Sequence, residues 1–189
     1  FGELTLGVLI FVGNLVFMKY LGDAGVGAFG IACYYAPFFF MMGNAVAQSA
    51  QPIISYDFGT GRHHRIHQAL RLMLATSVGF AVAVIAGFVF FPQPLTALFV
   101  DPQSQAGLLA IEGFPYFAAG ILFYILNIAL TGCYQSLENM RRATLIVILR
   151  TVLLVPCFLL LPLWLGVPGI WLAMPVAEML TLAVILIRR

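Results

Sequence analysis

Two carboxylates, Glu3 and Glu178, lie within apolar stretches of the sequence. Glu3 is near the start of the first stretch, and Glu178 is midway along the last. A carboxylate at membrane depth is costly, so one that remains there usually faces a cavity, a partner or an ion path. Both residues are therefore candidates for a functional site.

Three amides, Asn44, Gln48 and Gln51, follow the spacing i, i+4, i+7 and end beside Pro52. On a helix this spacing forms one polar stripe. Hydrogen bonds between membrane helices are worth about 0.6 kcal/mol each on average, and they are one explanation of the stripe. Three aligned amides exceed what packing needs, however, and polar groups at this depth need partners or water. We therefore expect the stripe to line a water-filled cavity.

The elements that carry these residues are predicted to be membrane-spanning helices. Of 189 residues only 16 are charged (nine basic and seven acidic), and 62% are hydrophobic. A soluble globule could not build a polar surface from this composition. Six apolar stretches are bounded by charges, prolines and glycines. They cover residues 4–18 (with a helix over about 1–18), 28–56, 72–91, 114–134, 144–165 and 168–187.

These stretches predict an all-α bundle of six transmembrane helices that forms one domain over residues 1–189. A span needs about 20 apolar residues, so the second stretch is long and should tilt, protrude or bend at Pro37 and Pro52. The first stretch is short and lacks an initiating Met. We therefore expect the first helix to begin upstream, as in a piece of a longer membrane protein.

The basic residues predict the orientation in the membrane. Eight arginines lie in or beside the even-numbered gaps and at the C-terminus, whereas the opposite gaps hold only Lys19. Positive residues favour the cytoplasmic side. Both ends of this predicted integral membrane protein are therefore expected to be cytoplasmic. Nothing in the charge pattern indicates nucleic acid as a partner.

Several other patterns favour structural roles. The small residues Ala75, Gly79, Ala83 and Gly87 recur every four positions and predict a face for close helix packing. The run of glycines over residues 25–30 matches G-x-G-x-x-G without the strand that a dinucleotide site needs, so we interpret it as a tight interfacial loop. The cysteines lack the spacing of a disulfide or a zinc site. His63 and His67 have the i, i+4 spacing that could hold a metal on one side of a helix, but no Cys or second acidic ligand accompanies them beyond Asp57, so we expect no metal and no cofactor.

The run from Gln51 to Arg62, QPIISYDFGTGR, resembles the multidrug and toxic compound extrusion (MATE) family. Further similar stretches are Leu21-Gly22 with residues 28–31, residues 92–101, and residues 166–171 with Pro175 and Glu178. The resemblance implies that the chain is the C-terminal lobe of a twelve-helix transporter whose N-terminal lobe is absent here. Such transporters are antiporters that expel organic cations and drugs while H⁺ or Na⁺ runs inward. The resemblance also implies that the chain is surrounded by membrane lipid, in the bacterial inner membrane.

The resemblance also implies which residues couple transport to the ion. Glu3 falls where the family carries a cation-binding carboxylate. A second family acid lies in the tenth helix, about two turns before the glycine that Gly132 matches. Here Tyr124 and Asn127 occupy that neighbourhood, so they join Glu3 as candidates for ion coupling, while Asn44, Gln48, Gln51 and Glu178 are candidates for the cavity wall.

Three other functions stay open. A flippase for a lipid-linked sugar, from the same wider superfamily, would use a basic cavity, and an Arg150 that faces the cavity would favour it. An intramembrane enzyme would need a reactive motif, and the sequence holds no H-E-x-x-H, G-x-S-x-G or Asp-rich run. A passive structural subunit is the third alternative.

Overall fold

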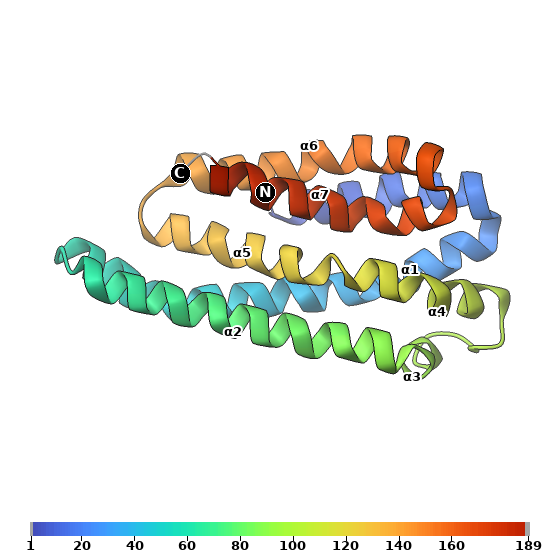
Figure 1. Cartoon of the computed structure of the whole chain (residues 1–189), viewed down its shortest axis with the longest axis horizontal. Coiled ribbons are helices and arrows are strands. Elements are labelled where there is room, and N and C mark those ends of the chain that lie inside the picture. The colour runs from blue at the N-terminus through green and yellow to red at the C-terminus, as the bar shows by residue number, and fades with distance from the viewer. Residues whose placement is uncertain (1, 188–189) are drawn as a thin grey trace.

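The structure is a computed structural model that describes the backbone of residues 2–187 and the side chains of residues 5–187. This part of the chain consists of helices joined by short turns, without a strand (Figure 1). Its helices are α1 (Gly2–Gly59), α2 (His63–Phe90), α3 (Pro92–Ala97), α4 (Gln105–Ala118), α5 (Ile121–Ser136), α6 (Met140–Leu165) and α7 (Val167–Ile187). The predicted all-α class is thus confirmed.

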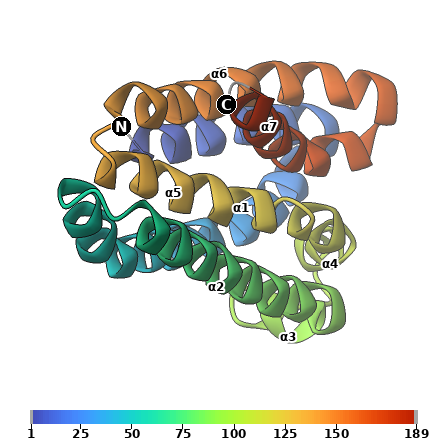
Figure 2. The same cartoon turned by 60° about the vertical axis from the view of Figure 1, so that its left-hand side comes forward.

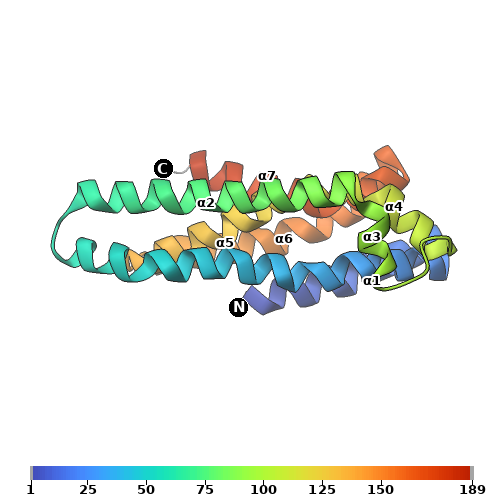
Figure 3. The same cartoon turned by 90° about the horizontal axis from the view of Figure 1, so that it is seen from below.

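Helix α1 supplies the first two membrane passes, and its halves run in opposite directions along the bundle (Figures 1 and 3). They meet at Gly22, whose φ of 64° and ψ of −157° lie outside the helical region. Glycine adopts such a positive φ at little cost because it has no Cβ. Pro37 and Pro52 lie inside α1 without a non-helical backbone, so the sharp bend is at a glycine. The predicted loop over residues 25–30 was wrong, because these residues are helical.

The fourth pass is built from two helices, α4 and α5, which meet at an angle of 51° across residues 119–120. A Cβ on Gly120 would lie 2.7 Å from the Cα atom of Pro175, so the backbones of α5 and α7 approach closely here. Four helices (α1, α2, α6 and α7) are long and apolar enough to span a membrane, and the bent pair is a fifth candidate. Because α1 is long enough for two passes, the fold contains the six passes that the sequence predicts.

The basic turns gather at one end of the bundle. The α1–α2 turn, the α5–α6 turn and the end of α7 share that end, and the α1–α2 hairpin extends beyond the others (Figures 1 and 3). Helix α2 begins at His63, so most of the predicted basic loop is its first two turns. We call this end the basic half. We call the opposite end, with the Gly22 bend, α3, α4 and the α6–α7 turn, the aromatic half.

Aromatic side chains fill the core of the aromatic half. Phe17 stacks on Phe29 with ring centroids 4.4 Å apart, and its edge meets Trp171 at 4.8 Å. These rings belong to α1 and α7, and Phe88 of α2 joins the same cluster. A second, small cluster in the basic half contains Val46, Met73, Ala129 and Cys133. The two clusters are therefore very unequal in size. Helix α5 lies between the α6–α7 pair and α2 (Figure 2).

The face of α2 predicted to pack closely is not used for packing within the described chain. Ala75, Gly79 and Ala83 are exposed, and a Cβ on Gly79 would meet nothing within 4 Å. The buried face of α2 is instead formed by Ile66, Met73, Ser77, Ala81 and Phe88. The small-residue spacing marks a surface that this part of the chain leaves open.

Candidate functional site

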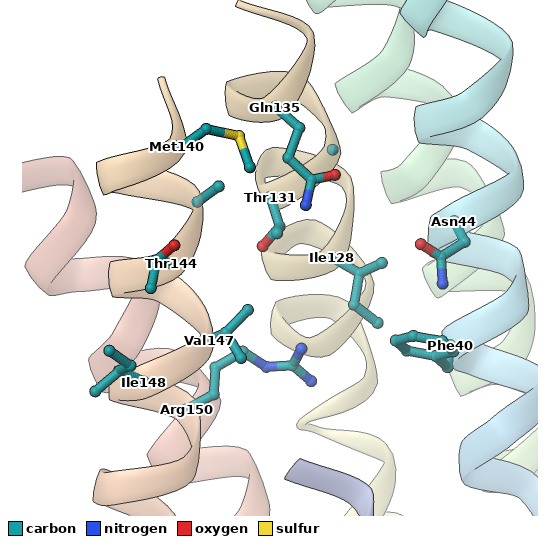
Figure 4. A pocket seen from close by; sticks show the side chains of 12 residues that line it. Phe40, Asn44, Ile128, Thr131, Gln135, Met140, Thr144, Val147, Ile148 and Arg150 are labelled. Carbon is teal, nitrogen blue, oxygen red and sulfur yellow. The ribbon is translucent and has the colours of Figure 1, made fainter. Parts of the chain in front are cut away.

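A cavity of about 520 Å³ lies between the second half of α1 and helices α5 and α6, within the basic half. Figure 4 shows side chains from all three helices around it. The wall contains Phe40, Asn44, Ile128, Thr131, Gly132, Gln135, Met140, Ala143, Thr144, Val147, Ile148 and Arg150. Its size and its mixture of apolar and polar groups are those of a small-molecule site, which occupies about 300–1,000 Å³.

The polar part of the wall is made of neutral groups and one cation. Helix α1 contributes the Asn44 amide to the cavity wall, and α5 contributes the side chains of Thr131 and Gln135. Arg150 is the charged member of the wall within the described chain, and its guanidinium points from α6 toward α5 (Figure 4). No described acidic side chain lines the cavity.

Arg150 forms a buried ion pair with Glu178 of α7 behind this wall. Its Nε donates to both carboxylate oxygens, at 2.9 and 3.0 Å, and Nη2 lies 2.9 Å from Oε1. The two side chains are only 3% and 4% exposed. Arginine matches a carboxylate with several parallel N–H donors, which makes such pairs strong and fixes their orientation. The pair therefore fixes the register between α6 and α7.

Helix α5 completes this cluster with Asn127 and Tyr124. The Asn127 amide donates to the Glu178 carboxylate at 2.7 Å and to the Glu178 backbone carbonyl at 3.0 Å. The Arg150 Cζ atom lies 4.6 Å from the centre of the Tyr124 ring, a favourable cation–π distance. The cluster thus joins α5, α6 and α7 deep in the bundle.

Two atoms of the cluster are left without a hydrogen-bond partner in the described chain. They are the Tyr124 hydroxyl and the Asn127 Oδ1 atom, and both are buried. Buried polar groups nearly always find a protein partner or an ordered water. These atoms are therefore positions where an ordered water can bind.

The ion pair also has a stability consequence. Taking two charges out of water is costly, and mutual attraction with good geometry offsets this cost. Removing one partner leaves the other charge buried and unpaired, which typically costs about 3–5 kcal/mol. Ionisable residues inside a membrane bundle are costly to keep and commonly functional. The cluster is thus the strongest functional candidate in the described chain.

The structure brings some of the predicted site residues together. Tyr124, Asn127 and Glu178 share the buried cluster, and Asn44 lines the cavity next to it. Glu178 itself lies behind Arg150 and is not among the wall residues. Gln48 and Gln51 continue along α1 toward the basic end as exposed side chains outside the cavity wall.

Glu3 belongs to the first turn of α1, and its side chain lies outside the described residues. Its neighbourhood is nevertheless defined, because the Thr5 hydroxyl lies 2.8 Å from the hydroxyl of Thr151. Thr151 directly follows Arg150 on α6. The start of α1 therefore lies beside the turn of α6 that carries the buried arginine.

The pairing of Arg150 with Glu178 was missed by the sequence analysis, which grouped Arg150 with the basic residues near the membrane surface. A signal was available. Gly166 separates α6 from α7, and Arg150 and Glu178 lie 16 and 12 residues from it on opposite sides. On the two arms of a helical hairpin these positions have similar depth, so opposite charges there can meet.

The comparison with protein families gives a match to the MatE model over residues 2–160, which is most of the chain. No curated protein gives a match in sequence.

Solved structures with this fold are membrane transporters. A MOP superfamily transporter from Pyrococcus furiosus, described with a binding pocket of reverse polarity, superposes with a TM-score of 0.88 at 15% identity. An outward-facing multidrug resistance MATE family transporter gives 0.86 at 17% identity. Their alignments cover 99% and 97% of this chain, but 42% of each transporter.

The lipid II flippase MurJ, in an inward closed conformation, gives a TM-score of 0.75 at 16% identity, over 98% of this chain and 40% of the flippase. The chain thus spans about two fifths of the length of the solved proteins that it resembles. At these identities the likeness establishes the fold, while the family match rests on the sequence itself. The chain therefore belongs to the MatE family and has the fold of MATE and other MOP superfamily transporters.

Proposed function

We propose that the chain is the C-terminal lobe of a secondary active antiporter that expels organic cations in exchange for H⁺ or Na⁺. The observation that carries this proposal is the buried Arg150–Glu178 pair beside a cavity of about 520 Å³ in a MatE family chain. The similar structures include outward-facing and inward-facing states of a MATE family transporter, which supports alternating access.

In this proposal the buried cluster keeps the lobe rigid while the lobe moves. Transporters of this kind work by rocking one helix bundle against another around a central site. The hydrogen bonds of Glu178 to Arg150 and Asn127 connect three helices, so α5, α6 and α7 move as one body. The apolar wall residues and the Asn44, Thr131 and Gln135 side chains would contact the substrate.

Ion coupling is assigned to Glu3, with Tyr124 and Asn127 as the neighbouring polar groups. The Thr5–Thr151 contact supports this assignment because it brings the start of α1 to the cluster. The carboxylate of Glu178 is already paired with Arg150, so we assign the exchange of a cation to Glu3 and not to Glu178. In the membrane, the basic half would face the cytoplasm of a bacterial cell, and the end of α7 with it.

Transport by the complete protein in proteoliposomes tests the proposal. Efflux of a fluorescent organic cation is followed while either a proton gradient or a sodium gradient is imposed alone. We expect one gradient to drive transport and Glu3→Gln to abolish the dependence on it. Glu112→Gln, at an exposed carboxylate of α4, is the matched control and should transport normally. Unchanged coupled transport in Glu3→Gln would remove Glu3 from the mechanism.

A flippase for a lipid-linked sugar is a second candidate, because Arg150 does line the cavity. A guanidinium suits a pyrophosphate group. Against it, both carboxylate oxygens of Glu178 already accept from Arg150, so the pair brings no net charge to the wall. Movement of a fluorescent lipid-linked sugar between leaflets, without movement of the organic cation, would favour the flippase.

A further inference from the structure

A second cavity, of about 340 Å³, forms a groove between the second half of α1 and α2, away from the Arg150 cluster. Its wall is almost wholly apolar. The lining residues are Ala45, Val46, Ser49, Ala50, Ile53, Ala69, Leu72, Met73, Thr76 and Phe80. Leu72 is 70% exposed and Ile53 is 49% exposed, so the groove opens to the surroundings of the helices. In a bilayer, the molecules next to such a surface are lipids.

The length of the groove matches one leaflet. On α2 it runs from Ala69 to Phe80, which lies 11 residues further along the helix. At a rise of about 1.5 Å per residue this corresponds to about 17 Å. Half of a hydrocarbon core about 30 Å thick is about 15 Å. One acyl chain of a phospholipid can therefore lie along the groove from the headgroup level toward the middle of the bilayer.

Positive charge lies at the basic end of the groove. Arg65 is one helical turn before Ala69, so the two residues share a face of α2. Its side chain is 58% exposed. Arg62, in the α1–α2 turn, has its Cζ atom 5.9 Å from the centre of the Tyr56 ring. Two guanidinium groups therefore flank the mouth through which an acyl chain would enter.

Asp57 pairs with Arg65 at this mouth but leaves the terminal N–H donors of the guanidinium without an acceptor among the described residues. The Asp57 side chain is 1% exposed, and its Oδ2 atom lies 3.5 Å from Nε of Arg65. Neither carboxylate oxygen accepts a hydrogen bond within the described chain. The long ion pair involves one nitrogen of Arg65, so the terminal N–H groups remain available to another acceptor. Phosphate oxygens are strong acceptors for arginine.

We propose that this groove binds an anionic phospholipid of the leaflet on the basic side, with one acyl chain between α1 and α2 and its phosphate on Arg62 and Arg65. The apolar wall selects the chain, and the two arginines select the headgroup. Basic residues beside a membrane helix attract anionic lipids in this way. The site lies apart from the proposed transport cavity, so it stands independently of the proposed function.

Native mass spectrometry of the complete protein tests the site. The detergent-purified protein is titrated with phosphatidylglycerol and, separately, with phosphatidylethanolamine of the same acyl chains. We expect tighter binding of phosphatidylglycerol. Arg62→Gln should weaken that binding about fivefold, the effect of one basic residue near an anionic surface. The double variant Arg65→Gln/Asp57→Asn should weaken it similarly, because it removes the arginine without leaving Asp57 unpaired.

Two controls separate the groove from general attraction to basic turns. Arg141→Gln/Arg142→Gln removes two charges from the start of α6, near the α5–α6 turn, and should leave the affinity unchanged. Ala69→Phe fills the groove and should reduce binding of both lipids, whereas Ala75→Phe, at an exposed position elsewhere on α2, should not. Equal affinity for the two lipids would overturn the proposal. The proposal would also be overturned if Arg141→Gln/Arg142→Gln weakened binding as much as Arg62→Gln does, or if Ala75→Phe weakened it as much as Ala69→Phe does. A groove covered by another part of the complete protein would overturn it too.

Discussion

In the aromatic half, the rings of Phe88 and Phe114 lie 4.9 Å apart and Phe17 contacts both Phe29 and Trp171, whereas in the basic half the helices leave a cavity of about 520 Å³. The three helices that line the cavity, α1, α5 and α6, also contribute residues to the aromatic core. Close packing fixes helix positions because displaced side chains lose many contacts at once. The aromatic half is therefore suited to be a fixed base, and the basic half has the room to hold a ligand.

The Arg150–Glu178 pair lies where the two kinds of packing meet. It is as buried as the aromatic core, yet Arg150 also forms part of the cavity wall. A charged pair specifies one arrangement of its helices more strictly than apolar contacts do, since its hydrogen bonds are directional. We therefore expect substitutions to have effects that depend strongly on which half they alter.

The largest expected effect comes from Glu178→Ala. It leaves Arg150 buried without a partner and should lower the free energy of unfolding by about 3–5 kcal/mol, measured by denaturant titration of the complete protein in detergent. The double variant Arg150→Met/Glu178→Leu removes both charges and should recover most of the stability. A double variant no more stable than Glu178→Ala would show that the pair is not what holds α6 to α7.

Phe88→Ala should be nearly as damaging, because the ring packs against Tyr35, Phe39 and Phe114. A buried Phe→Ala change typically costs about 3–5 kcal/mol. Phe40→Ala makes the same chemical change in the cavity wall, where the side chain is half-buried, and should cost less than half as much. Thermal unfolding of the two variants gives the comparison, and equal losses would contradict the contrast between the halves.

Gly120→Ala should be destabilising by about 1–3 kcal/mol, as is typical of overpacking. The new Cβ would meet the Pro175 backbone at 2.7 Å, and backbone cannot move aside as a flexible side chain can. Gly79→Ala is the matched control, because a Cβ there meets nothing within 4 Å of the described chain. It should be neutral or stabilise α2 by up to about 1 kcal/mol. Similar destabilisation by both would remove the argument from close approach.

Asn44→Ala should have the smallest effect on stability, within about 0.5 kcal/mol. Its effect should appear in transport, because the amide lines the cavity. Loss of one hydrogen bond to substrate, about 0.5–1.5 kcal/mol, would raise the apparent KM for the fluorescent cation about two- to tenfold. Gln48→Ala, one turn away and outside the wall, should leave the KM unchanged, and a larger change in Gln48→Ala would place the substrate elsewhere.

Much of the fold could be predicted because membrane passes are encoded locally. Hydropathy over about 20 residues marks a span, and the arginines mark one end of the bundle. The bends could not be placed this way. Prolines are the usual signal for a bend, yet the non-helical residue of α1 is Gly22, and Pro37 and Pro52 lie within the helix. At the break between α4 and α5, Gly120 lies close to Pro175, which is 55 residues away in sequence, and such a long-range approach cannot be located from the local sequence.

The candidate site was predictable in its members and not in its pairing. Tyr124, Asn127 and Glu178 could be selected because polar side chains stand out in apolar helices. Which of them meet depends on the relative rotation of three helices, and this left the partner of Arg150 unrecognised. The amide stripe shows the same limit, since Asn44 reaches the cavity and Gln48 and Gln51 lie beyond it on the same helix.

The bend at Gly22 joins two passes with no intervening coil. At that end of the bundle there is almost no connecting peptide for a protease to cut, for a glycan to occupy or for an inserted epitope to extend. A connection this short favours insertion of the two arms into a bilayer as one hairpin, because no loose segment links them.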